Sequence, residues 1–547
     1  MNSSQIVPTR AFLIAAVALL LCVASCSSVQ EQTQNCSRQF PTTSIDHIKP
    51  ISGIWFNFQC SDERYRYTNK CQAAYTCDDW ALKVSEMAEI GIRYIIFQSV
   101  ALRGKAFYRS AFMPGAGLAC DDPLGTVMRA AEQCGIEVFL SCEFVDNEDD
   151  DICDPQIMEG RIAIMREVAA QFSASRAFCG WYFSAEDDAS VLFRLGYFQY
   201  VNRLAYEARK LTPGAKILIA PYGLPLAKWS DKYLRQLESM DIDIIAYQDK
   251  VGCFRSFNPI EVSRKQFAAA RHLHDRVPRI ELWADIETFT WEGDIDSRAS
   301  ALVPAPFSRV LEQMAAVSPY VERIVAFTMQ GMADKPGSPA PTGHPTAEEQ
   351  YRQYEHFLNR ESDMLVLADA IDGHVQHAAI GARVILNSNA EGADRGFELV
   401  DGCTASLYNR REGWVMFKDG TMDITVDLGR RRKLDYIGIH LLADHWNGVF
   451  LPEKVNFAVS QDGANYVSIG NVEPYPWCTT GYDTRREIIT APRISTKARY
   501  VRIMSRGVII PNGVNPRDTT ILASEVIINP KKHGVRANRR VSIPLNQ

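Results

Sequence analysis

The sequence lacks several features that would assign it at once to a functional class. It has no excess of basic residues, because 59 Lys and Arg stand against 65 Asp and Glu, for a formal net charge of −6. Proteins that bind nucleic acid through its phosphates carry such an excess, so nucleic acid is not an expected partner. The sequence also contains no CxxC pair and no HExxH motif, and its 10 histidines are scattered. We therefore expect no metal site and no cofactor.

Long hydrophobic runs are scarce as well. The 547 residues are 46% hydrophobic, 10% aromatic and 23% charged, which is the composition of ordinary globular protein. This composition excludes intrinsic disorder, collagen-like repeats and a polytopic membrane protein. At roughly 100–200 residues per domain, the length indicates more than one domain.

One apolar run lies near the N-terminus, from Ala11 to Val23, and it follows a polar segment that carries Arg10. The run is short for a membrane span and has the layout of a signal peptide. The residues that follow, Ala24-Ser25-Cys26, resemble the lipobox of bacterial lipoproteins, in which the cysteine is acylated. We expect a signal peptide over residues 1–26 and a tether over residues 27–47. The alternative is secretion without a lipid.

The expected location is therefore the cell envelope, with a lipid anchor in the outer membrane or on the periplasmic side. The membrane would then be a partner through that anchor alone. Disulfides persist in such a compartment. Cys60, Cys71 and Cys77 cluster in one expected loop, where a local bridge is plausible, whereas Cys142 and Cys179 fall in apolar strands and are expected to be free thiols.

Apolar, β-rich runs recur between residues 51 and 332. Their starts lie about 40 residues apart on average, which is the length that a strand, a covering helix and two loops need. The runs are residues 51–58, 94–100, 137–143, 178–186, 216–222, 241–248, 279–287 and 322–330. Their hydrophobicity is continuous rather than alternating, which indicates strands that are buried on both faces in a parallel sheet.

The segments between these runs are helical in pattern. Asp79–Met87 places apolar residues at helical spacing, and Asp122-Pro123 forms an N-cap with Pro at the first helical position, followed by Gly135 past the end. Eight such units predict an α/β fold, a (β/α)8 TIM barrel, over residues 48–333. An open doubly wound sheet is the alternative, but it normally begins with a Gly-rich phosphate loop, which the first connection lacks.

The pattern changes after residue 333. Residues 334–374 are expected to form a linker with a helix, residues 375–531 an all-β sandwich of short alternating strands, and residues 532–547 a tail. The sandwich segment resembles the discoidin family (coagulation-factor type C modules), which includes sugar-binding members. The resemblance rests on five stretches taken in order: Val400–Gly402, Asp423–Gly429, Val459–Gly463, Ala498–Ile503 and Ser524–Val526.

Chemistry in a barrel of this kind is expected at the C-terminal ends of the strands. Two of the expected strand ends carry carboxylates, Glu186 on the fourth strand and Glu287 on the seventh. Retaining glycoside hydrolysis requires a pair of facing carboxylates, one as proton donor and one as nucleophile. The chain resembles clan A glycoside hydrolases in placing its acids on these two strands, which implies that Glu186 is the acid/base and Glu287 the nucleophile.

Other residues at the strand ends suit a sugar. Flat aromatic rings pack on the C–H face of a pyranose, and amides or carboxylates bind its hydroxyls. The expected substrate-binding residues are Trp55, Asn57, Gln98, Glu143, Tyr182, Tyr222, Tyr247, Gln248, Asp249, Trp283 and Gln330. For any single member, a place in the packed core or a solvated strand end is the alternative, and Asp249 is also suited to capping a loop.

The barrel also resembles a family of exported bacterial proteins with a barrel typical of glycoside hydrolases, catalogued as a domain of unknown function. The matching stretches are Gly180–Glu186, Ala246–Gly252 and Leu282–Phe289, within residues of about 48 to 360. Clan A members usually have Asn before the strand-four glutamate, and this chain has Ala185 there. A hydrogen bond to the sugar 2-hydroxyl would then have to come from another residue.

In the sandwich, His445 and Trp446 lie in a loop-like stretch and are candidates for an accessory glycan-binding platform. The sequence as a whole thus predicts a retaining glycoside hydrolase that acts on an extracellular or periplasmic glycan and carries an accessory carbohydrate-binding domain. The alternative is a surface lipoprotein that binds glycans without cleaving them.

Overall fold

The computed structural model describes residues 45–60, 62–141, 144–145, 152–253, 259–293, 299–388, 390–391, 393–407, 409–410, 412–474, 484–510 and 519–531. All of them belong to one compact unit, Ser44–Gln547. The expected signal peptide, Cys26 and Glu143 lie outside the described residues, as does the side chain of Trp446. Among the helices within these ranges, none is long and apolar enough to cross a membrane.

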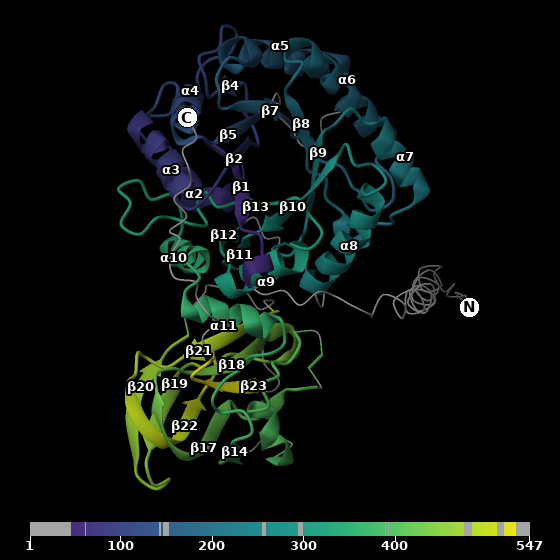
Figure 1. Ribbon diagram of the computed structural model, residues 1–547. Helices are drawn as coiled ribbons and strands as arrows, with labels where there is room; N and C mark the ends of the chain where they lie inside the picture. The colour runs from purple at the N-terminus through teal and green to yellow at the C-terminus, as the bar shows by residue number, and fades with distance from the viewer. Residues whose placement is uncertain are drawn as a thin grey trace, which may run out of the picture. The chain divides into compact units, whose positions relative to one another are not determined.

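Eight parallel strands close into a barrel in the order β1-β13-β10-β9-β8-β7-β5-β2 (Figure 1). Each strand falls within one of the eight apolar runs of the sequence, and the pairing of β1 with β13 excludes the open sheet. The strands are β1 (Ile51–Phe56), β2 (Tyr94–Phe97), β5 (Glu137–Ser141), β7 (Phe178–Phe183), β8 (Lys216–Ile219), β9 (Ile244–Gln248), β10 (Glu281–Glu287) and β13 (Arg323–Phe327).

Helices form the outer ring of the barrel in Figure 1. They are α3 (Cys77–Glu89), α4 (Pro123–Cys134), α5 (Pro155–Phe172), α6 (Leu195–Leu211), α7 (Asp231–Ser239), α8 (Pro259–His274) and α9 (Phe307–Val317). The N-cap Asp122 accepts a hydrogen bond from the Gly125 amide, and Gly135 ends α4 with φ of 70°. The start and end signals predicted for this helix are therefore confirmed.

A disulfide joins the start of α3 to the residues before α4, between Cys77 and Cys120, with Cα atoms 4.9 Å apart. The expected local bridge among Cys60, Cys71 and Cys77 is therefore wrong. The two joined residues are far apart in sequence, and the packing of α3 on α4 brings them together.

The connections that follow the strands form the top of the barrel. The connection after β1 contains η2 (Glu63–Tyr65) and α2 (Arg66–Gln72), and the one after β10 contains the antiparallel pair β11 (Phe289–Trp291) and β12 (Leu302–Pro304). Short strands β3 (Ala101–Leu102), β4 (Lys105–Ala106) and β6 (Phe144–Val145) make a small three-stranded sheet. These connections lie at the C-terminal end of the barrel because each one leaves a strand.

After the barrel come α10 (Ala347–Leu358), α11 (Ser362–Ile371) and two antiparallel five-stranded sheets. One sheet contains β14 (Arg383–Leu386), β17 (Thr421–Leu434), β22 (Thr496–Arg506), β19 (Val455–Ser460) and β20 (Tyr466–Val472). The other contains β15 (Ala390–Glu391), β16 (Val415–Phe417), β23 (Ile521–Ile528), β18 (Ile437–Asp444) and β21 (Thr484–Thr490). Their inner faces share one apolar core, as the alternating pattern predicts.

Candidate active site

Glu186 follows β7 at the mouth of the barrel and is exposed to solvent. Its carboxylate accepts a hydrogen bond of 2.8 Å from Nε2 of Gln248, the last residue of β9. The same Nε2 also donates to the Ala220 carbonyl at 3.1 Å, and this second bond fixes the orientation of the Gln248 amide. The predicted proton donor is therefore accessible and fixed by a neutral donor from another strand.

Glu287 ends β10 and is only 5% exposed. Both of its carboxylate oxygens contact Cys253: Oε2 accepts from the backbone amide at 2.7 Å, and Oε1 accepts from the thiol at 3.2 Å. The Lys250 ammonium lies 3.9 Å from Oε1. A Cβ on Gly252 would lie 2.9 Å from the Glu287 Cβ, so the turn packs directly on this side chain. The turn after β9 thus holds the predicted nucleophile.

The backbone of Glu287 is also held on both sides of the residue. Its amide donates to Oδ1 of Asp249 at 3.1 Å, and its carbonyl accepts from Arg309 and Gln313 of α9, both at 3.0 Å. Oδ2 of Asp249 accepts from the same Gln313 amide at 2.8 Å. Asp249 was predicted to bind substrate, but its side chain is buried and supports the backbone of Glu287.

Burial shapes the protonation of the neighbouring acids. Burial, together with the Glu287 carboxylate, raises the pKa of Asp249 to about 7. Burial raises the pKa of Asp285 well above its usual range, and the polar side chain of Trp55 lowers it in part. The neighbouring carboxyl groups raise this pKa further; they belong to Asp249, Glu287 and Glu186. These acids repel one another in a water-poor site, so the protonated forms of Asp249 and Asp285 are favoured.

Lys250 links the two predicted catalytic acids electrostatically. Burial alone would lower the pKa of its ammonium, but Glu287, Cys253, Glu186 and Asp285 raise it, and the net direction is upward. The ammonium lies over the ring of Tyr222, 5.5 Å from the centroid. Glu186 and Glu287 therefore both raise the pKa of one lysine. Half-buried Tyr222, which sequence reasoning expected to bind a sugar, lies beside the ammonium of that lysine.

Three amide side chains join the strand ends on another part of the mouth. Nδ2 of Asn57 donates to Gln98 at 2.7 Å, and the Gln330 side chain bonds the Asn57 amide and carbonyl, both at 2.8 Å. Gln330 is buried, and both polar atoms of its side chain form hydrogen bonds with the Asn57 backbone. The Asn57 and Gln98 residues are half-buried. The structure therefore brings these predicted residues together, with Gln330 in a supporting place.

The predicted aromatic residues are less accessible than a sugar platform requires. Trp55, Tyr182 and Trp283 are 3%, 2% and 0% exposed and belong to the apolar layers inside the barrel. Tyr247 is wholly buried, and its hydroxyl lies 3.0 Å from that of Tyr233 on α7. It points outward because neighbouring residues of a strand alternate in direction, and Gln248 points inward. A ligand at the mouth does not reach Tyr247 or Trp283, which corrects their assignment.

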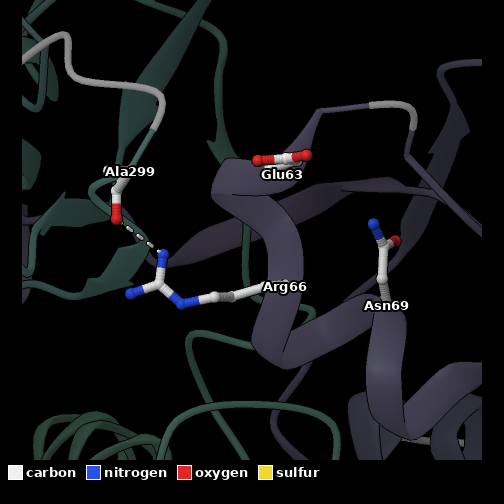
Figure 2. Close-up of a pocket in the computed structure, with 4 residues that line it drawn as sticks. All are labelled: Glu63, Arg66, Asn69 and Ala299. Atoms are coloured by element: carbon white, nitrogen blue, oxygen red, sulfur yellow. Dashed lines mark hydrogen bonds between the residues drawn. The ribbon is translucent and has the colours of Figure 1, made fainter.

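A hollow of about 520 Å³ lies among the connections that follow β1 and β10 (Figure 2). Glu63, Arg66, Asn69 and Ala299 line it. Arg66 reaches across and donates to the Ala299 carbonyl at 3.0 Å, and it also pairs with Glu292. The volume falls in the range of small-molecule sites. Because both connections leave the C-terminal ends of strands, the hollow belongs to the same end of the barrel as the carboxylates.

Sequence reasoning missed Lys250, Cys253, Arg309 and Gln313. The first two follow the predicted strand end at Gln248 by a few residues, so position alone was a usable signal for them. Arg309 and Gln313 lie one turn apart on a helix, where polar residues are usually solvated. The contact of these two with Glu287 depends on tertiary packing, and the sequence carried no signal for it.

In the sandwich, His445 is 6% exposed and stacks on Phe450, with ring centroids 5.6 Å apart. A buried, stacked ring does not offer a glycan platform, which corrects the prediction for His445. The predictions for the Trp446 side chain and for Glu143 fall outside the described residues.

Solved structures similar to this chain include glycoside hydrolases. A Bacteroides thetaiotaomicron protein with the provisional name alpha-L-fucosidase is 17% identical, with a TM-score of 0.46, over 59% of this chain and 97% of that chain. A Ruminococcus gnavus GH29 fucosidase in complex with fucose is 11% identical, with a TM-score of 0.33, over 89% of this chain and 94% of that chain.

A chitosan-binding module from a chitosanase/glucanase of Paenibacillus sp. IK-5 is 16% identical, with a TM-score of 0.20, over 28% of this chain and 98% of that chain. Because these TM-scores lie below 0.5, we base the function on the residues of the mouth. The comparison with curated proteins found no match.

The family model described as "Domain of unknown function (DUF4434)" matches residues 51–340, which is more than half of the chain. The matched residues include all eight strands of the barrel and both carboxylates at its mouth. The match agrees with the expected resemblance of the barrel to a domain of unknown function. The chain therefore belongs to the DUF4434 family.

Proposed function

We propose that the barrel is a retaining glycoside hydrolase that acts on an extracellular or periplasmic glycan, with the sandwich as an accessory, discoidin-like carbohydrate-binding domain. The observation that carries the proposal is the pair of held carboxylates at one mouth. Glu186 follows the fourth barrel strand and Glu287 ends the seventh, and both carboxylates raise the pKa of Lys250 and of Asp285. A glycosidase of this type needs two carboxyl groups in one pocket. The expected export of the chain sets the location of the glycan.

In the proposed mechanism, Glu186 protonates the leaving glycosidic oxygen and Glu287 attacks the anomeric carbon. Exposure gives Glu186 access to the glycosidic oxygen, and the Gln248 amide fixes its carboxylate through a hydrogen bond to Oε1. Two hydrogen-bond donors, the Cys253 amide and its thiol, and the nearby Lys250 ammonium stabilise the negative charge on Glu287. After the glycosyl group has transferred to Glu287, ionised Glu186 activates water for hydrolysis.

A glycan screen for released reducing ends, followed by kinetics on aryl glycosides, tests this proposal. Glu287→Ala should abolish turnover while sparing glycan binding, and added azide should restore cleavage of an activated aryl glycoside by replacing the carboxylate. Glu186→Gln should slow substrates with poor leaving groups by about 100- to 10,000-fold. Activated aryl glycosides should be affected far less.

The control is Glu159→Gln, which removes an acid from the surface of α5 and should leave the rates unchanged. Full activity of the Glu287→Ala protein would overturn the assignment of the nucleophile.

A specific observation favours the second candidate, a glycan-binding protein that does not cleave. Glu287 is 5% exposed, and the Cys253 turn packs on it, whereas a nucleophile must reach an anomeric carbon. In that case the wild-type protein would bind a glycan in the screen and release no reducing ends.

A further inference from the structure

Helix α9 is buried along its whole length. All 11 of its residues, Phe307–Val317, are buried, whereas a helix on the outside of a barrel normally keeps one polar face in water. The helix packs on β10 of the barrel and also on β21 of the sandwich. It therefore belongs to two structural cores at once.

One face of α9 holds the proposed nucleophile. Arg309 donates to the carbonyls of Glu287 and Phe289 at 3.0 and 2.6 Å. Gln313, one turn later, donates to the Glu287 carbonyl and to Asp249. These bonds reach the Glu287 carbonyl directly and its amide through Asp249, so the position of α9 sets the position of the carboxylate.

Polar residues of the same helix bind the sandwich. Arg486 of β21 donates from Nε to Oε1 of Glu312 at 2.9 Å, and the two side chains are 6% and 2% exposed. Ser308 donates to Glu487 of the same strand at 2.9 Å. Arg486 also donates to the carbonyls of Ala370 and Ala405, both at 3.2 Å. One buried guanidinium thus ties α9 to the sandwich.

A second route runs through the turn that holds the Glu287 carboxylate. Val251 lies in that turn between Lys250 and Cys253, and it is 5% exposed. It packs in one apolar cluster with residues of the sandwich, namely Ala405, Leu407, Trp414, Leu442, Val449 and Leu522. The sandwich therefore supports the nucleophile both from the helix side and from the turn side.

We propose that the C-terminal sandwich is a positioning domain for Glu287 as well as a binding module, and that Arg486 is a positioning residue that acts through α9. The inference rests on the proposed function for its kinetic part. The site needs this support because reacting groups must be held in place by packed and hydrogen-bonded neighbours. A displacement of about 1 Å at a reacting group costs roughly 100-fold in rate.

The test uses the full chain with the double substitution Glu312→Gln and Arg486→Met. Both partners are changed because removal of one alone would leave a buried, uncompensated charge. The control is Asp427→Asn with Arg499→Met, which removes a more exposed ion pair that joins β17 and β22 in the other sheet, away from α9. Hydrogen exchange of the Cys253 and Glu287 amides is measured along with kcat and KM on an aryl glycoside.

We expect faster exchange at both amides and a fall in kcat of about tenfold or more with little change in KM, because substrate contacts remain while the nucleophile shifts. The control should match wild type in both measurements. Arg486→Lys keeps a cation beside Glu312, so its exchange rates and kcat should lie between those of the double variant and the control. This single variant replaces the double variant in the test if the latter does not fold.

Unchanged exchange at both amides would overturn the inference whether or not the protein is an enzyme. Faster exchange with unchanged kcat would also overturn the positioning role, as would the same response in the control. A wild-type protein without activity would instead overturn the proposed function, and the exchange measurement would still decide whether the sandwich supports Glu287.

Discussion

At the scale of single residues, the protonation of the acids around Glu287 depends on how much water each one has lost. Asp249 is 1% exposed, and burial together with the charge of Glu287 raises its pKa, although its oxygens accept three hydrogen bonds from N–H groups. Glu186, by contrast, is exposed at the mouth. Different surroundings thus prepare chemically similar groups for different roles.

This contrast predicts a pH-dependent stability. Between the ordinary pKa of 3.8 and the native value of about 7, native Asp249 keeps a proton that the unfolded chain has released. The free energy of unfolding of the wild type therefore falls as pH rises through this window. Asp249→Asn removes the titration, so its Tm should rise relative to wild type between pH 4 and pH 7 in thermal melts. Parallel curves for the two proteins would contradict the shift.

At the scale of elements, the connections after the strands carry the site. The end of β9 and the turn after it supply a donor to each predicted catalytic acid, with Gln248 of the strand bound to Glu186 and Cys253 of the turn bound to Glu287. Gly252 allows the close approach, since a Cβ there would lie 2.8 Å from the Phe289 carbonyl oxygen.

The disulfide fixes two other elements. Cys77 and Cys120 are separated by 43 residues, and a bridge that closes such a loop stabilises a fold by about 4 kcal/mol. Reduction should therefore lower the Tm of the wild type in calorimetry. A Cys77→Ala, Cys120→Ala protein should start at the lower Tm and show no further change on reduction, and equal responses of the two proteins would contradict the assignment.

At the scale of the whole molecule, the shared helix α9 predicts cooperative unfolding. Val310, Leu311 and Met314 of α9 lie in the core of the barrel, and Ala316 lies in the cluster shared with the sandwich. Loss of either partner would expose an apolar face of this helix. We expect one calorimetric transition whose calorimetric and van't Hoff enthalpies agree. The Glu312→Gln, Arg486→Met protein should separate it into two, and two transitions in wild type would contradict the shared core.

The sequence alone determined the strands of the barrel, because strands buried on both faces are continuously apolar and recur at the length of a strand–helix unit. It also determined that Glu186 and Glu287 follow the fourth and seventh strands, since the strand order in a closed barrel follows the order in the chain. The alternation of side chains could have excluded Tyr247 from the mouth once Gln248 was assigned to it.

Only the tertiary structure decided the depth of Trp283 in the barrel, the partner of Cys77 and the support of Glu287 by α9. The physical reason is the same in each case. Local pattern reports which face of an element is apolar, but it does not report which distant element covers that face. Arg486 and Glu312 are 174 residues apart, and a buried pair of this kind exists only once both domains have packed on one helix.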